Sequence, residues 1–68
     1  MNADLLKGEI KAHGMTQEEV AKKIGISLSR FNAKLNNTDG AEFSLGEARS
    51  IINLFSLDPT RIDQIFFG

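Results

Sequence analysis

Apolar residues recur three or four positions apart along most of the chain, which is the spacing of one face of an α-helix. The recurring sets are Leu6 and Ile10; Val20, Ala21 and Ile24; Phe31 and Leu35; Leu45, Ala48, Ile51, Ile52 and Phe55; and Ile62, Ile65 and Phe66. No segment shows the alternation of a half-buried strand. The pattern therefore predicts an all-α domain of five short helices around one compact core.

Capping residues indicate where the helices begin. An initial helix is expected in "ADLLKGEIKAH", and the caps expected for the next four helices are Thr16, Ser27, Ser44 and Asp58. Glu19 and Glu47 each follow a hydroxyl cap by three residues, which is the spacing of a capping box. Pro59 follows Asp58 at the first helical position, where its missing N–H costs nothing.

Glycines indicate where two helices end. Gly14 and Gly25 each follow a helical segment, at a position where a left-handed backbone is cheap only for glycine. His13 is expected to donate a hydrogen bond at a helix end, because no second histidine and no cysteine could complete a metal site with it. Gly8 and Gly46 lie inside helical patterns, where close helix packing is the expected reason for a glycine. The turn-rich run "NNTDGAE" is expected to be a loop.

Two good helical segments, "TQEEVAKKI" and "SLSRFNAKL", are separated only by "GIS". A turn of about three residues lets two helices cross at roughly 90–120° instead of continuing as one helix. The second helix is then supported from behind and free to protrude.

The protruding helix, from Ser27 to Leu35, has two faces. Phe31 and Leu35 are expected to face the core. The other side carries small hydroxyl and amide side chains flanked by cations: Ser27, Ser29, Asn32, Ala33 and Asn36, with Arg30 and Lys34. Asparagine can bond adenine bidentately, alanine or leucine can touch a thymine methyl, and cations neutralise phosphates. This face is typical of a helix that enters the major groove of DNA.

Composition narrows the function further. The 68 residues carry a net charge of −1, distributed as +2 through Lys34 and −3 after it, so the basic excess lies in the half that contains the broken helix. The absence of cysteine rules out disulfides and zinc–cysteine sites and suits a reducing cytoplasm. There is no signal-like or membrane-length apolar run. No catalytic constellation can be assembled, so neither an enzyme nor a cofactor is expected.

The chain resembles the Cro-like and phage-repressor-like helix-turn-helix proteins. The resemblance rests on "TQEEVAKKIGIS", with Gln17, Ala21, Gly25, Ile26, Ser27 and the apolar Phe31 at matching intervals. The further pattern "RFNAKLNNTDGAEFSLGEARSIINLFSL", with a terminal "IFF", resembles very small phage and prophage regulators. The resemblance implies a single DNA-binding domain over residues 1–68, of the lambda-repressor-like type, with the helix-turn-helix at its second and third helices.

The resemblance also implies which residues would contact DNA. The base-reading positions fall on Gln17, Leu28, Ser29, Asn32 and Ala33. Gln17 begins the preceding helix, whose free N-terminus can point at an anion. The residues expected to contact phosphates are Ser27, Lys22, Arg30, Lys34 and Asn36. For Lys22 and Lys23 a merely solubilising helix face stays an open alternative. Leu28 stands where many relatives carry glutamine, and it either meets a thymine methyl or packs back toward Phe31.

The chain ends with two large rings, Phe66 and Phe67. Adjacent helical positions diverge by about 100°, so one small monomer cannot easily bury both rings. Either Phe66 closes the core while Phe67 covers an edge, or both join Ile62 in a dimer or partner interface. The expected partner is a double-stranded DNA operator, bound by a transcriptional regulator that forms a homodimer. The alternative is a phage or prophage modulator, or antirepressor, that binds another repressor protein through the same scaffold.

Overall fold

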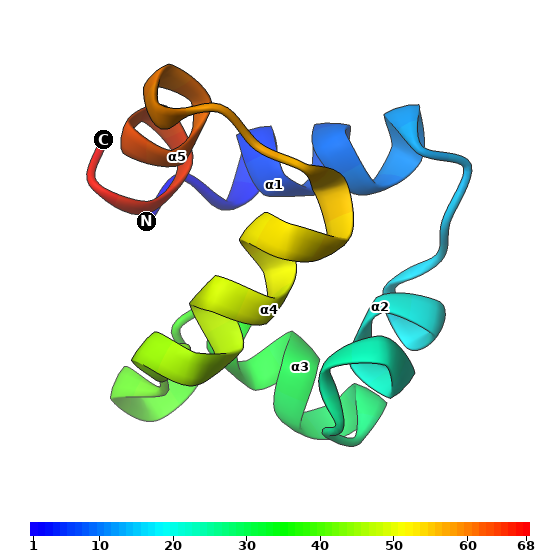
Figure 1. Cartoon of the computed structure of the whole chain (residues 1–68). Coiled ribbons are helices and arrows are strands. Elements are labelled where there is room, and N and C mark those ends of the chain that lie inside the picture. The colour runs from blue at the N-terminus through cyan, green and yellow to red at the C-terminus, as the bar shows by residue number, and fades with distance from the viewer.

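A computed structural model describes all residues, 1–68, and shows a chain of five α-helices without strands (Figure 1). The helices are α1 (Ala3–Ala12), α2 (Gln17–Ile24), α3 (Leu28–Leu35), α4 (Leu45–Phe55) and α5 (Pro59–Phe66). The predicted loop between α3 and α4 contains a single 3₁₀ turn, η1 (Thr38–Gly40). The all-α prediction with five helices is therefore confirmed. None of the helices has the length and apolar character that a membrane crossing requires.

Each of the five helices begins with a side-chain cap. In every case a side-chain oxygen accepts a hydrogen bond from the backbone N–H three residues later, and the capping residues are Asn2, Thr16, Ser27, Ser44 and Asp58. The return bonds of the two predicted capping boxes are also present: Glu19 accepts from the Thr16 N–H at 2.9 Å, and Glu47 from the Ser44 N–H at 2.8 Å. A cap of this kind typically contributes about 1 kcal/mol, so these short helices depend on their caps.

Three helices end through a residue with left-handed backbone. Gly14 has φ 67°, Gly25 φ 82° and Ser56 φ 51°. After each, the next N–H donates to a carbonyl five residues back, as Ile26 does to Ala21 at 3.0 Å. This is the 6→1 bond of a Schellman motif. The two glycines confirm the sequence prediction, whereas Ser56 shows that a serine also serves at such a position.

Nine apolar side chains form the core, and every helix contributes to it. They are Leu6, Ile10, Val20, Ala21, Phe31, Leu35, Ile51, Phe55 and Ile65, each at most 4% exposed. All nine belong to the predicted apolar series. Leu45 belongs to the same predicted series but is 78% exposed. It is the first residue of α4, directly after the Ser44 cap, and the helix reaches the core only further along.

Gly8 and Gly46 do not mark close helix packing, contrary to the prediction. A β-carbon at Gly8 would meet no atom within 4 Å, and one at Gly46 would meet only the Ser44 hydroxyl, at 4.0 Å. Both glycines are exposed. A helical glycine therefore need not indicate a neighbouring backbone.

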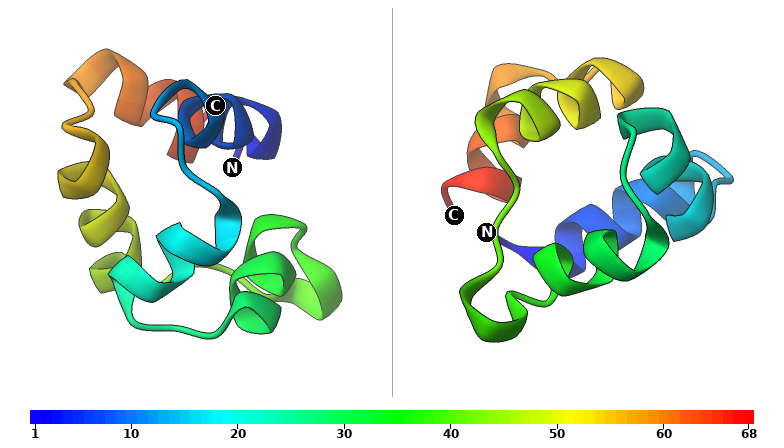
Figure 2. Two further views of the ribbon diagram at one scale, coloured as in Figure 1. Left: turned by 90° about the vertical axis from the view of Figure 1, so that its right-hand side faces the viewer. Right: turned by 90° about the horizontal axis from the view of Figure 1, so that it is seen from below.

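The helices surround one core, and α3 and α5 lie apart from each other in it (Figures 1 and 2). α2 packs against both α3 and α4, while α1 packs against α5. The two ends of the chain meet there, since the Asn2 N–H donates to the Ile65 carbonyl at 2.6 Å. Arg61 Nε also lies 3.0 Å from Glu9 Oε2. α1 and α5 are thereby tied together, whereas α3 packs against α2. The C-terminal end of α3 comes near the chain ends, since Leu35 lines the same pocket as Met1 and Phe66.

Replacing Gly25 tests the turn between α2 and α3. Gly25→Ala should lower the free energy of unfolding by about 1–2 kcal/mol, because alanine is strained at a positive φ even though the added carbon meets nothing within 4 Å. Gly8→Ala is the matched control, since it adds the same carbon in a helix interior and should stabilise by about 0.5–1 kcal/mol. Urea titrations of both variants measure the difference. Equal effects at the two positions would contradict the strained-turn account.

Candidate nucleic-acid interface

The candidate interface is built on α2, the turn Gly25–Ser27 and α3. Gly25 reverses the backbone, Ile26 is half-buried, and the Ser27 hydroxyl accepts the Arg30 N–H at 3.2 Å to start α3. Because the turn has only three residues, the direction of α3 is set by the end of α2. Figures 1 and 2 show that α3 turns away from the line of α2 and forms an outer edge of the molecule.

The inner face of α3 is anchored by two side chains. Phe31 is fully buried and Leu35 is 2% exposed. The Phe31 ring also packs at a tilt against Phe43, which precedes α4, with 5.4 Å between the ring centroids. Burying a side chain of this size contributes about 1.5–3 kcal/mol, so the orientation of α3 about its own axis is strongly biased.

The other positions of the helix and its flanks lie at or near the surface. The exposed positions are Ser27, Leu28, Ser29, Arg30 and Asn36, and the half-buried ones are Asn32 and Ala33. Gln17, the first residue of α2, is also half-buried. Leu28 is 39% exposed and is not among the side chains packed against the core. On an ideal helix it lies about 20° from Leu35, so it leaves an apolar group exposed at the start of α3, in line with the buried stripe. Apart from Arg30 and Lys34, the other accessible side chains of α3 are short, and most of them are polar.

The cations around α3 are of two kinds. Lys22, Lys23 and Arg30 are exposed, and no carboxylate lies within ion-pair distance of them. Lys34 differs because its Nζ lies 2.5 and 2.7 Å from the two carboxylate oxygens of Glu47. The three free cations can meet an external anion without breaking an existing pair, whereas Lys34 cannot.

Glu47 has an unusual environment for a surface carboxylate. The hydrogen bond from Lys34, with the Ser44 backbone N–H as the next contribution, holds the pKa of the Glu47 carboxyl below its ordinary value, although partial burial opposes this. The group is therefore ionised at neutral pH, and it joins the start of α4 to the last turn of α3.

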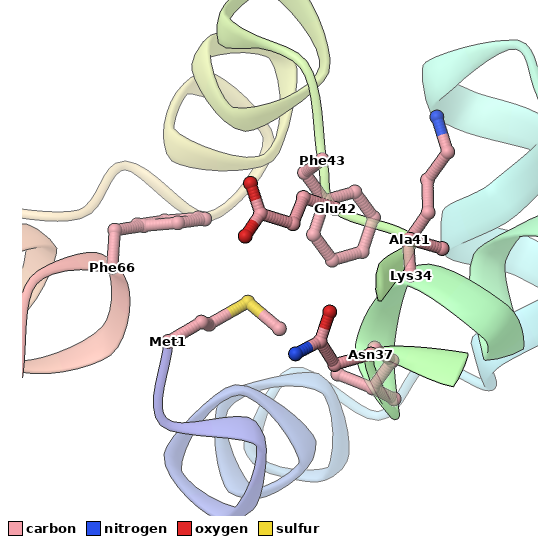
Figure 3. Close-up of a pocket in the computed structure, with 8 residues that line it drawn as sticks. Met1, Lys34, Asn37, Ala41, Glu42, Phe43 and Phe66 are labelled. Carbon is pink, nitrogen blue, oxygen red and sulfur yellow. The ribbon is translucent and has the colours of Figure 1, made fainter. Parts of the chain in front are cut away.

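A pocket of about 230 Å³ lies at the C-terminal end of α3. Figure 3 shows Met1 and the rings of Phe43 and Phe66 around it, with the Glu42 carboxylate and the Asn37 amide at its edge. Glu42 and Asn37 are both exposed, so neither is a fixed polar group that would select a ligand. The sequence pattern did not predict this pocket, because its walls come from segments far apart in the chain.

The C-terminal rings differ in burial. Phe66 is half-buried, packs against the core and lines the pocket, whereas Phe67 is 78% exposed. Ile62 is half-buried. Phe67 therefore leaves a large apolar surface facing outward at the end of α5.

His13 lies at the end of α1, away from any cluster of ligands. Its Nδ1 is 2.9 Å from the Glu9 backbone carbonyl, which can only accept, so Nδ1 carries the proton. The ring also packs against Phe55, with 4.7 Å between centroids. The expected helix-end donor is confirmed. Nowhere does the structure gather three His, Cys, Asp or Glu side chains that could hold a metal ion.

No protein-family model, curated protein or solved structure matches this chain.

The Lys34–Glu47 pair makes a prediction about pH. The folded pKa of Glu47 lies below its ordinary value of 4.5, so ionisation stabilises the fold above that pH, and the contribution is lost as pH falls through the folded pKa. Glu47→Gln should cost about 1 kcal/mol near neutral pH, and the cost should shrink as pH falls below 4.5. Urea titrations between about pH 7 and pH 3 measure this.

The control for this prediction is Glu42→Gln, since Glu42 is exposed and has no ion-pair partner. That variant should unfold like the wild type throughout the same range. A Glu47→Gln deficit that persists unchanged at acidic pH would contradict an ionic origin.

Proposed function

We propose that this protein is a sequence-specific DNA-binding transcriptional regulator that inserts α3 into the major groove of an operator. The observation that carries the proposal is the α2–turn–α3 unit, in which a helix anchored by Phe31 and Leu35 turns a small polar side toward solvent. An α-helix fits the B-DNA major groove, and short polar side chains let it approach the base edges. The resemblance to Cro-like and phage-repressor-like proteins, with their lambda-repressor-like fold, supports the same proposal.

The base-reading role is proposed for exposed and half-buried residues of α3 and for Gln17 at the start of α2. Asn32 is suited to a bidentate contact with adenine, and Ser29 to either a donor or an acceptor edge. Ala33 and the exposed Leu28 offer methyl groups to thymine. Gln17 reaches the DNA from the start of α2, where free N–H groups also favour a phosphate.

Phosphate binding is proposed for the free cations and for two polar residues at the ends of α3. Arg30, Lys22 and Lys23 are exposed and unpaired. The Ser27 hydroxyl oxygen accepts the capping hydrogen bond from the Arg30 N–H, and its proton can still be donated to a phosphate. Asn36 is exposed just after the last turn of α3. The net charge of −1 does not prevent such binding, because salt screens distant charges and the contacts with a few phosphates depend mainly on the cations beside them.

A two-fold pair would give the protein two reading helices. In regulators of this kind the two helices lie about 34 Å apart, one turn of DNA. The domain measures 27 × 24 × 20 Å, so two copies side by side are compatible with that spacing. The pairing surface proposed is the end of α5, where Phe67 is 78% exposed beside the half-buried Phe66 and Ile62.

A second candidate function is supported by the exposed apolar side chains. Leu28 on α3, Leu45 on α4 and Phe67 after α5 are 39%, 78% and 78% exposed. Protein interfaces are centred on apolar side chains, so a modulator that binds another repressor protein would use this kind of surface. Such a protein would show no sequence-specific DNA binding by itself.

Selection from a library of random DNA duplexes at low salt distinguishes the two functions. A regulator should enrich a short sequence with two-fold symmetry, which the protein then protects in a footprint. A modulator should enrich nothing, because phosphate contacts alone do not distinguish sequences. The absence of any enriched sequence would overturn the operator proposal.

Replacing Asn32 tests base reading. Asn32→Ala should cost about 1–3 kcal/mol on the selected sequence, relax the preference at one base pair, and leave affinity for random DNA nearly unchanged. Asn53→Ala is the matched control, since Asn53 is an exposed asparagine on α4. Fluorescence anisotropy with single-base variants of the site measures both. An equal loss on selected and random DNA would show that Asn32 reads no base.

Replacing Phe67 tests the pairing surface. Because the ring is 78% exposed, Phe67→Ser should leave the monomer folded while removing apolar area from the interface. We expect a dimer-to-monomer shift in sedimentation and the loss of tight binding to the symmetric site, with weak non-specific binding retained. Leu45→Ser removes an equally exposed side chain and should leave the dimer intact. A Phe67→Ser variant that still pairs would place the interface elsewhere.

A further inference from the structure

Lys34 and Glu47 form the most enclosed ion pair in the molecule. Their side chains are only 14% and 17% exposed, and the ammonium contacts both carboxylate oxygens. Lys34 is one of the residues that line the pocket, but in Figure 3 its ammonium points away from it. The pair joins the last turn of α3 to the first turn of α4, across the loop that contains η1.

The Glu47 carboxylate is itself held in place by the cap of α4. Its Oε1 accepts the Ser44 N–H at 2.8 Å, and the Ser44 hydroxyl accepts the Glu47 N–H at 3.1 Å. The ammonium of Lys34 is therefore tied to a carboxylate that the backbone of α4 already orients, and not to a freely rotating surface acid.

The pair restrains α3 at a point beside its apolar stripe. On an ideal helix Phe31 and Leu35 lie about 40° apart, and Lys34 lies about 60° to one side of Phe31, while Asn32 lies about 100° to the other. Two buried side chains hold the helix against the core, but a contact at the side resists rotation about the helix axis. The direction in which Asn32 and Ser29 point depends on that rotation.

We propose that Lys34 and Glu47 are positioning residues that fix the rotation of α3 and thereby set its base specificity, and that Lys34 makes no phosphate contact. This inference rests on the proposed DNA-binding function and differs from the sequence prediction, which grouped Lys34 with the phosphate-contacting cations. Arg30, which is exposed and unpaired, keeps the phosphate role.

The test compares three variants on the selected site and on random DNA over a range of salt. Arg30→Met should weaken binding to both DNAs and flatten the salt dependence by about one counterion. Lys34→Met keeps the apolar stem, and Glu47→Gln keeps an oxygen for the Ser44 N–H. Both should lower the ratio of specific to random affinity by about tenfold. The salt slope and the affinity for random DNA should stay unchanged in Lys34→Met, whereas Glu47→Gln frees the Lys34 ammonium and should not weaken binding to random DNA.

Two further variants separate positioning from simple stability. Lys34→Arg retains a cation for Glu47 and should restore the specificity ratio. The double variant Lys34→Met/Glu47→Gln should be no worse than either single variant, because both changes break one interaction. A Lys34→Met variant that flattens the salt slope like Arg30→Met, or a Glu47→Gln variant with a steeper slope and full specificity, would overturn the inference.

Hydrogen exchange gives a measurement that needs no DNA. In Glu47→Gln the amides in the last turn of α3 should exchange faster, while those of α1 and α5 stay as in the wild type. Unchanged exchange in α3 would overturn the restraint even if the protein binds DNA. A different result would be faster exchange in α3 of Glu47→Gln together with a wild-type protein that binds no DNA. That result would overturn the DNA-binding function and the role of the pair in specificity, but it would confirm that the Lys34–Glu47 pair restrains α3.

Discussion

The burial of Phe31 and Leu35 is the constraint on which the candidate interface depends. α3 has eight residues, fewer than an isolated helix needs to be stable in water. Its polar side faces outward only because its apolar side is held by the core that α1, α2, α4 and α5 also build. The Ser27 cap and the Gly25 turn then determine where this helix starts and which way it runs.

Charged side chains take two different roles around this core. Arg61 pairs with Glu9 across α5 and α1, and Lys34 pairs with Glu47 across α3 and α4, so each pair joins two helices that are distant or separated by a loop. Lys22, Lys23 and Arg30 make no such pair and lie on α2 and α3. The same residue types thus either hold the fold together or stay available to a partner, and only the three-dimensional arrangement separates the two groups.

Much of the fold could be predicted because its signals are local. The caps at Thr16, Ser27, Ser44 and Asp58 bond within three residues, and Gly25 reports on its own backbone. The nine core side chains could also be predicted, because apolar residues recur at the helical period. It could not exclude Leu45, because periodicity does not show where along a helix the core begins.

The candidate site was less predictable because its important features are not local. Lys34 and Glu47 are thirteen residues apart, so a helix pattern shows one as a flanking cation and the other as a capping acid. The pocket joins Met1 to Phe66, which no sequence spacing indicates. Ser56 in a left-handed conformation was missed because glycine is the usual residue there. The buried side of α3, in contrast, could be predicted from the spacing of Phe31 and Leu35.

The central claim is that the outward side of α3 is the surface that meets DNA. Amide NMR spectra recorded while a DNA duplex is added at low salt test it most directly, because non-specific contacts suffice to map the surface. The account predicts shift changes confined to α2 and residues 27–36, with the amides of α1 and α5 unaffected. Changes centred on α5 or on the pocket around Phe66, with α3 unchanged, would contradict it.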